Sequence, residues 1–214
     1  MMKIKRVFKI AGLLLAGILL ALLVAPFVFK DRILAEVKKF ANESVNAKID
    51  FRDIDVSFIR SFPEVSVSIL DLQVMGIDTF HEQNLLKAKD LSLDFSLVPL
   101  FNSEAPKSIK YVALKDADIN IIVLNDSVAN YLITKPGKDT SGVSFALEGY
   151  ELTACNLTYK DVTMPLNMQL RGVNHKGSGD IANAIYDLNT STAADSLTID
   201  FDGFTYLKNV KAGL

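Results

Sequence analysis

Two aspartates offer the most direct route to catalysis in this sequence. Asp53 and Asp55 lie two residues apart in a segment where apolar and polar residues alternate. Positions two apart on a strand share a face, and two carboxyl groups on one face can share a proton and act as acid and base. The same spacing is also typical of a solvated strand face. We favour the solvated face and expect neither aspartate to carry catalysis.

Two short motifs resemble ligand-binding loops but are incomplete. Asp200-Phe201-Asp202-Gly203 resembles the start of a calcium loop, yet the later ligands and the distal glutamate do not follow. Gly177-Ser178-Gly179 lacks the Gly-Lys-Ser/Thr of a phosphate-binding loop. We expect a hairpin turn at the first motif and a turn at the second.

The histidines and the cysteine give no catalytic or metal-binding pattern. His81 lies beside Glu82 and His175 beside Lys176, so both are expected to be surface residues. Cys155, the single cysteine, has apolar neighbours in an alternating run, which favours a buried, inert thiol. One cysteine excludes an internal disulfide and a multi-cysteine metal site. We therefore expect no catalytic residue, no cofactor and no metal, and a protein that is not an enzyme.

The charges are divided unevenly along the chain. Residues 1–30 contain five of the 23 basic residues and none of the 25 acidic ones. Residues 31–214 thus carry 18 basic against 25 acidic residues, a formal net charge of −7. An acidic body without a stripe of Lys and Arg argues against binding to nucleic acid.

An uncharged segment follows the basic N-terminus. Residues 10–29 form an apolar run of 20 residues, which as a helix would span roughly 30 Å, the thickness of a bilayer core. The excess of positive charge in residues 1–9 predicts a cytoplasmic N-terminus, a transmembrane helix over 10–29 and a body on the other side. A cleaved signal peptide is the alternative, but its apolar region is normally 7–15 residues long.

Residues 30–48 are expected to form an amphipathic helix and a linker. Between 31 and 45, apolar residues recur at helical spacing, with charged and polar residues on the other side, among them Lys38 and Asn42. The helix either packs on the following sheet, which we favour, or lies on the membrane surface.

Residues 49–214 change to a period of two, which predicts a mainly β body built as an antiparallel sheet. Apolar residues change parity between Ile69 and Leu70, as a β-bulge would produce. The expected strands are 49–58, 65–74, 91–97, 109–123, 143–159, 164–171, 184–190, 197–201 and 204–210.

The clearest alternation lies in 91–97. Leu91, Leu93, Phe95 and Leu97 share one face, against Ser92, Asp94 and Ser96 on the other. These four apolar residues line either a groove or an ordinary core beneath a helix, and the pattern alone does not separate the two. The alternation runs to the end at Leu214, so we expect an open strand edge there, completed by a longer chain or by another strand donor.

Several segments, in their order after a single apolar span, resemble the AsmA family. They are Val56–Val67, Leu70–Gly76, Leu85–Leu93, Ser96–Leu100 and Asn125–Ile133. The last resembles the family's "DGxANYxI" turn, with Ser127 where glycine is usual. The resemblance is clear from the apolar span to about residue 135 and looser beyond.

The resemblance implies an inner-membrane protein of the Gram-negative envelope with a periplasmic β-rich body. Members of the family are grouped with bridge-like lipid transfer proteins that are built from repeating β-grooves. It implies a twisted β-groove that continues beyond residue 214, binds or conducts phospholipid between the inner and outer membranes, and contributes to outer-membrane biogenesis. It also favours Leu91, Leu93, Phe95 and Leu97 as groove residues over core residues. The alternative is a membrane-tethered scaffold or assembly factor for outer-membrane proteins that conducts no lipid.

Overall fold

The computed structural model divides the chain into two units, Met1–Val37 and Lys38–Leu214. It describes residues 9, 10, 12–14, 17, 34, 35, 38, 39, 41–43, 45–57, 64–96, 107–135, 143–179 and 189–214. In the first unit, the described residues are helical. No helix within the described residues is long and apolar enough to cross a membrane. Most of the expected span 10–29 lies outside them.

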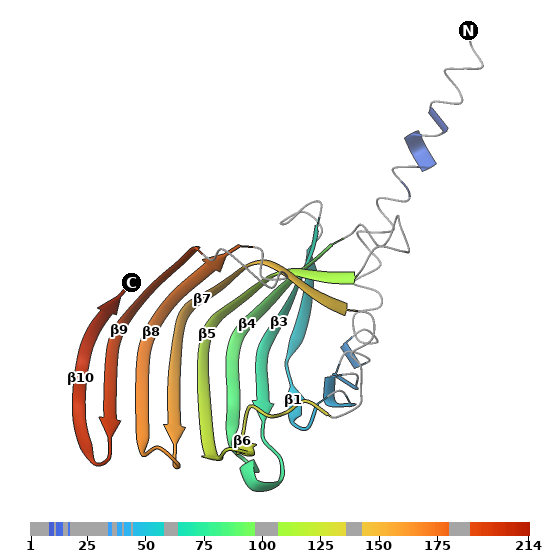
Figure 1. Cartoon of the computed structure of the whole chain (residues 1–214). Coiled ribbons are helices and arrows are strands. Elements are labelled where there is room, and N and C mark those ends of the chain that lie inside the picture. The colour runs from blue at the N-terminus through green and yellow to red at the C-terminus, as the bar shows by residue number, and fades with distance from the viewer. Residues whose placement is uncertain are drawn as a thin grey trace. The chain divides into compact units, whose positions relative to one another are not determined.

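The second unit is built on one curved β-sheet, as the alternation predicted (Figure 1). The strand order is β1-β3-β4-β5-β7-β8-β9-β10, with β2 paired to β3 and β6 paired to β5. The elements are β1 (Lys48–Asp50), β2 (Asp53–Ser57), β3 (Glu64–Met75), a 3₁₀ turn (Asp78–Phe80), β4 (Asn84–Ser96), β5 (Lys107–Asn125), β6 (Val128–Ala129), β7 (Val143–Asp161), β8 (Leu166–Ser178), β9 (Asn189–Phe201) and β10 (Phe204–Gly213).

The expected antiparallel sheet is confirmed for every pair of strands described except one. Strands β5 and β7 pair in parallel, from Lys107 beside Val143 to Val123 beside Asp161. A parallel pair needs a connection that returns along the length of the strands. The segment after β5 provides it, passing through β6 before β7 begins.

Two of the expected strand boundaries were wrong at the C-terminal end. Strand β9 is continuous from Asn189 to Phe201, where we expected two strands, and residues 184–188 lie outside the described residues. The break was misplaced because 189–196 contains Asn, Thr, Ser, Ala and Asp without apolar alternation. Strand β8 runs on to Ser178, so Gly177 is a strand residue and not part of a turn.

Left-handed residues mark a line across the sheet. Asp71 in β3, Asp116 in β5, Ala154 in β7 and Gly172 in β8 all have φ between 48° and 58°. The parity change predicted in β3 lies at this line, but no residue is inserted relative to β4. Leu70 pairs with Asp90 and Leu72 with Ala88 in one unbroken register. Both strands therefore change parity together.

Small, buried side chains lie on one face of the sheet beside these left-handed residues, where the strands bend. Ala88, Ala117, Cys155 and Ala194 are at most 5% exposed, and Val173 is 8% exposed. Ala88 pairs with Ala117, and Cys155 with Val173. Small residues suit the inside of a bend because neighbouring side chains converge there. The prediction that Cys155 is buried is confirmed, and burial raises the pKa of its thiol.

Candidate functional site

One face of the sheet carries an unbroken row of aliphatic side chains. Cross-strand partners share a face, so the row can be followed through the strand register. It consists of Ile49, Val74, Leu86, Ile119, Leu157, Leu170, Leu197 and Val210, one residue from each of β1, β3, β4, β5, β7, β8, β9 and β10. We call the side of the sheet that bears this row the apolar face.

Two further rows continue the apolar face on the other side of the bend. They are Ile54, Ile69, Leu91, Leu114 and Leu152, and Val56, Val67, Leu93, Val112 and Tyr150, from β2, β3, β4, β5 and β7 in each case. Leu91, Leu93 and Phe95 lie on one face of β4, half-buried, with apolar partners on β3 and β5. Leu97 lies outside the described residues.

The opposite side of the sheet, the polar face, carries hydrogen-bonding and charged residues. Ser68 and Ser92 are joined by a 2.7 Å hydrogen bond between their hydroxyls, and Ser92 donates to Asp90 at 2.9 Å. At the bend, Asp71 pairs with Arg52 at 2.6 Å and with Lys89 at 3.5 Å. The guanidinium of Arg52 and the ammonium of Lys89 hold the pKa of Asp71 below its ordinary value. The sheet therefore separates apolar from polar side chains strand by strand.

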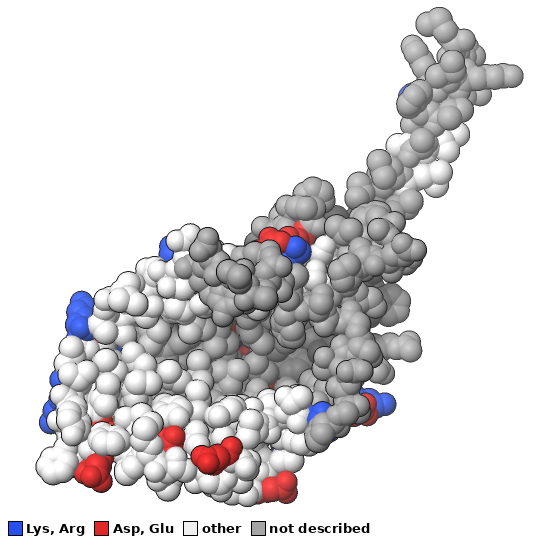
Figure 2. Space-filling view, in the orientation of Figure 1, with Lys and Arg blue, Asp and Glu red and all other residues white. Residues whose placement is uncertain are grey.

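Within the described residues, no second layer of secondary structure covers the apolar face. Figure 2 shows a hollow whose described wall is almost free of charged residues, with acidic residues gathered along the lower rim. Strand contacts in the described part of the chain run between neighbours within the sheet, and no described helix packs on Leu91, Leu93 or Phe95.

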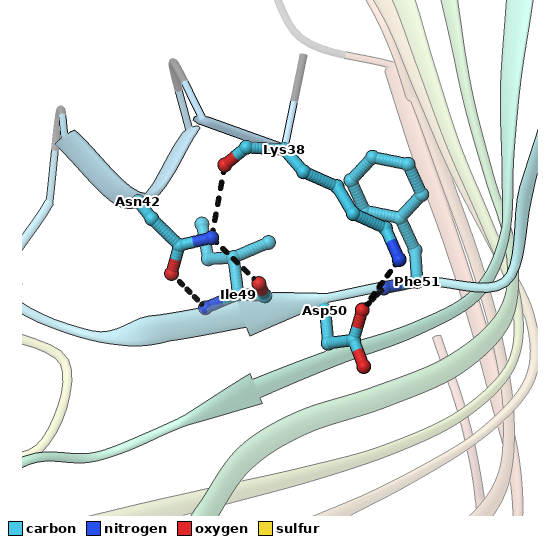
Figure 3. A network of polar contacts seen from close by, with 5 residues as sticks. All are labelled: Lys38, Asn42, Ile49, Asp50 and Phe51. Carbon is cyan, nitrogen blue, oxygen red and sulfur yellow. Dashed lines mark hydrogen bonds and ion pairs between the residues drawn. The ribbon is translucent and has the colours of Figure 1, made fainter. Parts of the chain in front are cut away.

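The edge of the sheet at β1 is closed by the side chains of Lys38 and Asn42 (Figure 3). Asn42 accepts from the Ile49 amide at 2.8 Å and donates to the Ile49 carbonyl at 2.7 Å. Lys38 pairs with Asp50 at 2.6 Å and lies 4.9 Å from the centre of the Phe51 ring. The hydrogen bond from Lys38 lowers the pKa of Asp50.

The expected helix over 31–45 is described only in part. Residues 34, 35, 38, 39 and 41–43 are helical, and Val45 instead forms a bridge to Thr134. Packing against the sheet was the favoured expectation. Among the described residues, contacts with the β1 edge come from Lys38 and Asn42, which were assigned to the polar side, whereas Ile33, Val37 and Phe40 of the apolar side lie outside the described residues. An edge strand has unpaired amides and carbonyls, so polar side chains satisfy it better than apolar ones.

The opposite edge of the sheet, formed by β10, differs from the β1 edge. Among the described residues, β10 pairs with β9 alone, and its outer edge has no partner strand. Phe204 and Tyr206 on this strand are 69% and 66% exposed. The predicted turn at Asp202-Gly203 is confirmed as the β9–β10 hairpin, in which both residues have positive φ.

On the apolar face, the side chains of Tyr150, His175 and Thr192 form a polar cluster that the sequence analysis missed. The hydroxyl of Tyr150 lies 3.0 Å from Nε2 of His175, and Nδ1 of His175 lies 2.8 Å from the hydroxyl of Thr192. The Tyr150 and His175 rings are 5.3 Å apart. His175 was expected at the surface because a turn was assigned to 177–179. His175 is the cross-strand partner of Leu152 and therefore lies on the same, apolar face of the sheet.

The remaining candidates lie on β2 and in the turn before β4. Asp53 and Asp55 pair with Leu70 and Ser68 of β3, Asp55 is exposed, and Asp53 accepts from the Ile54 amide at 2.8 Å. His81 is exposed in the turn that precedes β4. In the part of the chain that the structure describes, no three His, Cys, Asp or Glu side chains are grouped to hold a metal ion.

Asp161 is an acidic residue at the end of β7 with its carboxylate fully engaged. It accepts from the Thr163 hydroxyl at 2.7 Å, the Thr163 amide at 2.9 Å and the Met164 amide at 3.1 Å, while Tyr159 donates to its other oxygen at 3.1 Å. These hydrogen bonds, that of the Thr163 hydroxyl foremost, lower the pKa of Asp161. Its role is to close the β7–β8 turn.

Comparison with known proteins does not place the chain in a family. No protein-family model matches the sequence. A search of the curated proteins finds no match either.

Proposed function

We propose that this chain is a lipid-binding protein whose apolar face holds the acyl chains of phospholipids. The observation that carries the proposal is the row of eight aliphatic residues across β1 to β10. An ordinary sheet packs such a face against another layer. Here the described elements provide no second layer, so an apolar ligand is the natural partner of the face.

The physical basis is the hydrophobic effect. Each methylene buried on the face contributes about 0.8 kcal/mol, so a few carbons of one acyl chain give a substantial driving force. The row has no polar interruption from β1 to β10, so an acyl chain can move from strand to strand without meeting a charged side chain. Binding of this kind needs no catalytic residue, cofactor or metal.

The apolar segment 10–29 supports a membrane-anchored role. As a transmembrane helix with residues 1–9 in the cytoplasm, it would hold the sheet in the periplasm of a Gram-negative cell. We propose membership of the AsmA family on the segments that resemble it. We further propose that the protein carries phospholipid between the inner and outer membranes, and so contributes to outer-membrane biogenesis.

The two edges of the sheet fit a groove that continues in one direction. Asn42 and Lys38 close the β1 edge, whereas β10 can pair with a further strand. Strand addition at β10 would extend the aliphatic row beyond Val210.

The proposal is tested by placing a charge on either face of one strand. Leu197 belongs to the aliphatic row, and its neighbour Thr198 pairs with Gln169 on the polar face. Both residues are half-buried, which makes them a matched pair. The full chain is purified from cells in a mild detergent, and the bound phospholipid is measured by mass spectrometry.

We expect Leu197→Lys to lose most of the bound phospholipid and Thr198→Lys to keep it. Circular dichroism must show the same strand content for both variants. Equal amounts of phospholipid on the two variants would contradict the proposal.

The alternative role, a membrane-tethered scaffold for outer-membrane protein assembly, is favoured by one observation. The open edge of β10, with Phe204 and Tyr206 exposed, could pair with a strand of a client protein. Under this alternative the two lysine variants would carry equal, background amounts of phospholipid. Replacement of the exposed Phe204 and Tyr206 on β10 by serine would then reduce assembly of outer-membrane proteins.

A further inference from the structure

The polar cluster of Tyr150, His175 and Thr192 interrupts two otherwise apolar rows. The row that begins at Ile54 is aliphatic through Leu152 in β7 and then continues with His175 in β8 and Thr192 in β9. The row that begins at Val56 ends in the same way, with Tyr150, Gly177 and Thr190. Three adjacent strands therefore change from apolar to hydrogen-bonding side chains at one end.

The backbone beneath the cluster is adapted to it. A Cβ atom on Gly177 would lie 2.5 Å from the Tyr150 ring, so only glycine lets the ring lie flat across β8. This position brings the Tyr150 hydroxyl within 3.0 Å of His175. The tyrosine is therefore held against the sheet with its hydroxyl in a fixed place.

The cluster has hydrogen-bonding capacity left over. The two hydroxyls carry one proton each, and the neutral imidazole carries one. Two hydrogen bonds join the three groups and use two of these protons. In either tautomer of His175, one terminal hydroxyl keeps a free proton to donate and the other keeps lone pairs to accept.

The charged residues around the cluster indicate which kind of acceptor group would take a hydrogen bond from the free hydroxyl proton. The basic residues of these strands lie on the polar face: Lys176 pairs with Glu151 and Ser191, Lys160 with Asn167, and Arg171 with Ser196. A phosphate is normally bound by Arg or Lys, and none of these reaches the cluster's side of the sheet. An uncharged acceptor fits better.

We propose that Tyr150, His175 and Thr192 form a site for the ester carbonyl groups of a glycerolipid. This inference rests on the proposed function, since the acyl chains are held by the apolar face. From His175 towards Met168, strand β8 rises by roughly 3.3 Å per residue. The chains of a lipid bound at the cluster would run over Val173 and Leu170 towards Met168. The site thereby fixes the depth and direction of the lipid in the groove.

The test compares two phospholipids that differ only at the carbonyl groups. Vesicles contain equal amounts of ester-linked and ether-linked phosphatidylglycerol with the same chain lengths. The full-length protein in detergent is incubated with them and re-isolated, and the ratio of the two bound lipids is measured by mass spectrometry. We expect the wild type to hold about five times more ester than ether lipid, the ratio that one net hydrogen bond gives.

The variant is Tyr150→Phe combined with Thr192→Val, which keeps the shape of both side chains and removes both hydroxyls. We expect its ratio to fall to about one while its total bound lipid stays near that of the wild type. Tyr159→Phe is the matched control, because Tyr159 lies on the same face of β7 but bonds to Asp161. It should keep the wild-type ratio.

A ratio of one on the wild type, or a wild-type ratio on the double variant, would overturn the ester site and leave the proposed function standing. No lipid of either kind on the wild type would overturn the proposed function, and this inference with it.

Discussion

The side-chain amide of Asn42 makes both hydrogen bonds to Ile49 that a neighbouring strand would make. Its oxygen accepts from the Ile49 amide at 2.8 Å, and its nitrogen donates to the Ile49 carbonyl at 2.7 Å (Figure 3). The amide of Asn130 is used in the same way beside β5, where it accepts from the Ile122 amide and donates to the Asn120 carbonyl. Single asparagines thus satisfy strand edges at two places in the sheet.

Replacement of Asn42 should loosen the β1 edge. Asn42→Ala removes two part-buried hydrogen bonds to Ile49, so we expect a loss of about 1–3 kcal/mol in the free energy of unfolding. Hydrogen exchange of the Ile49 amide should also become faster. The control is Asn46→Ala, because Asn46 is exposed and contacts Ile133 through its backbone amide. Unchanged exchange at Ile49 would show that Asn42 does not protect this edge.

The left-handed bend at Gly172 should not accept a side chain. Its φ is +58°, and a Cβ atom there would lie 2.2 Å from the Asp195 carboxylate. Gly172→Ala should therefore cost about 1–3 kcal/mol of stability for the backbone, with the clash in addition. Gly203→Ala has the backbone cost without the clash, since nothing lies within 4 Å of that position. In denaturant unfolding, equal losses for the two variants would contradict a steric role for Asp195.

The inside of the bend should not accept a larger side chain. Ala117 is 1% exposed on the apolar face, so Ala117→Leu should destabilise the sheet by about 1–3 kcal/mol through overpacking. Ala113 lies on the polar face of the same strand, half-buried between Ser92 and Glu151. Ala113→Leu should have a smaller effect on the melting temperature. A larger loss of stability for Ala113→Leu than for Ala117→Leu would mean that the bend is not tightly packed on the apolar face.

Asp161 in the β7–β8 turn should make the free energy of unfolding depend on pH. The folded-state pKa of Asp161 is lowered by its hydrogen bonds, so its contribution is complete above the ordinary carboxyl pKa. The contribution is lost as the pH falls through the lowered value. Denaturant unfolding from neutral pH to strongly acidic pH should show the wild type approaching Asp161→Ala in stability. A difference that stays constant with pH would contradict this role.

Much of the sheet could be predicted from alternation. The apolar positions of 91–97 gave the correct face for Leu91, Leu93 and Phe95, because each half-buried strand repeats with a period of two. The parity change after Ile69 correctly marked the bend. The bend itself shifts the period in β3, β4, β5, β7 and β8, which is why the full aliphatic row across eight strands was not visible in any one segment.

The features that were missed depend on contacts distant in sequence. The parallel pairing of β5 with β7 follows from the return segment through β6, which has no periodic signal of its own. The cluster of Tyr150, His175 and Thr192 combines one residue from each of three strands, 17 to 25 positions apart for the bonded pairs. Asn42 was assigned to the polar side of a helix, because a hydrogen bond to a strand edge leaves no pattern in sequence.

The central claim is that the apolar face is covered by lipid. The most direct measurement is photo-crosslinking in Gram-negative cells that express the full-length protein, with a photoreactive residue placed in turn at Leu93, Phe95, Ser92 and Asp94. All four are half-buried and alternate between the two faces of β4. We predict phospholipid adducts at 93 and 95 and none at 92 and 94. Protein adducts alone at 93 and 95, or phospholipid adducts of equal yield at all four positions, would contradict the account.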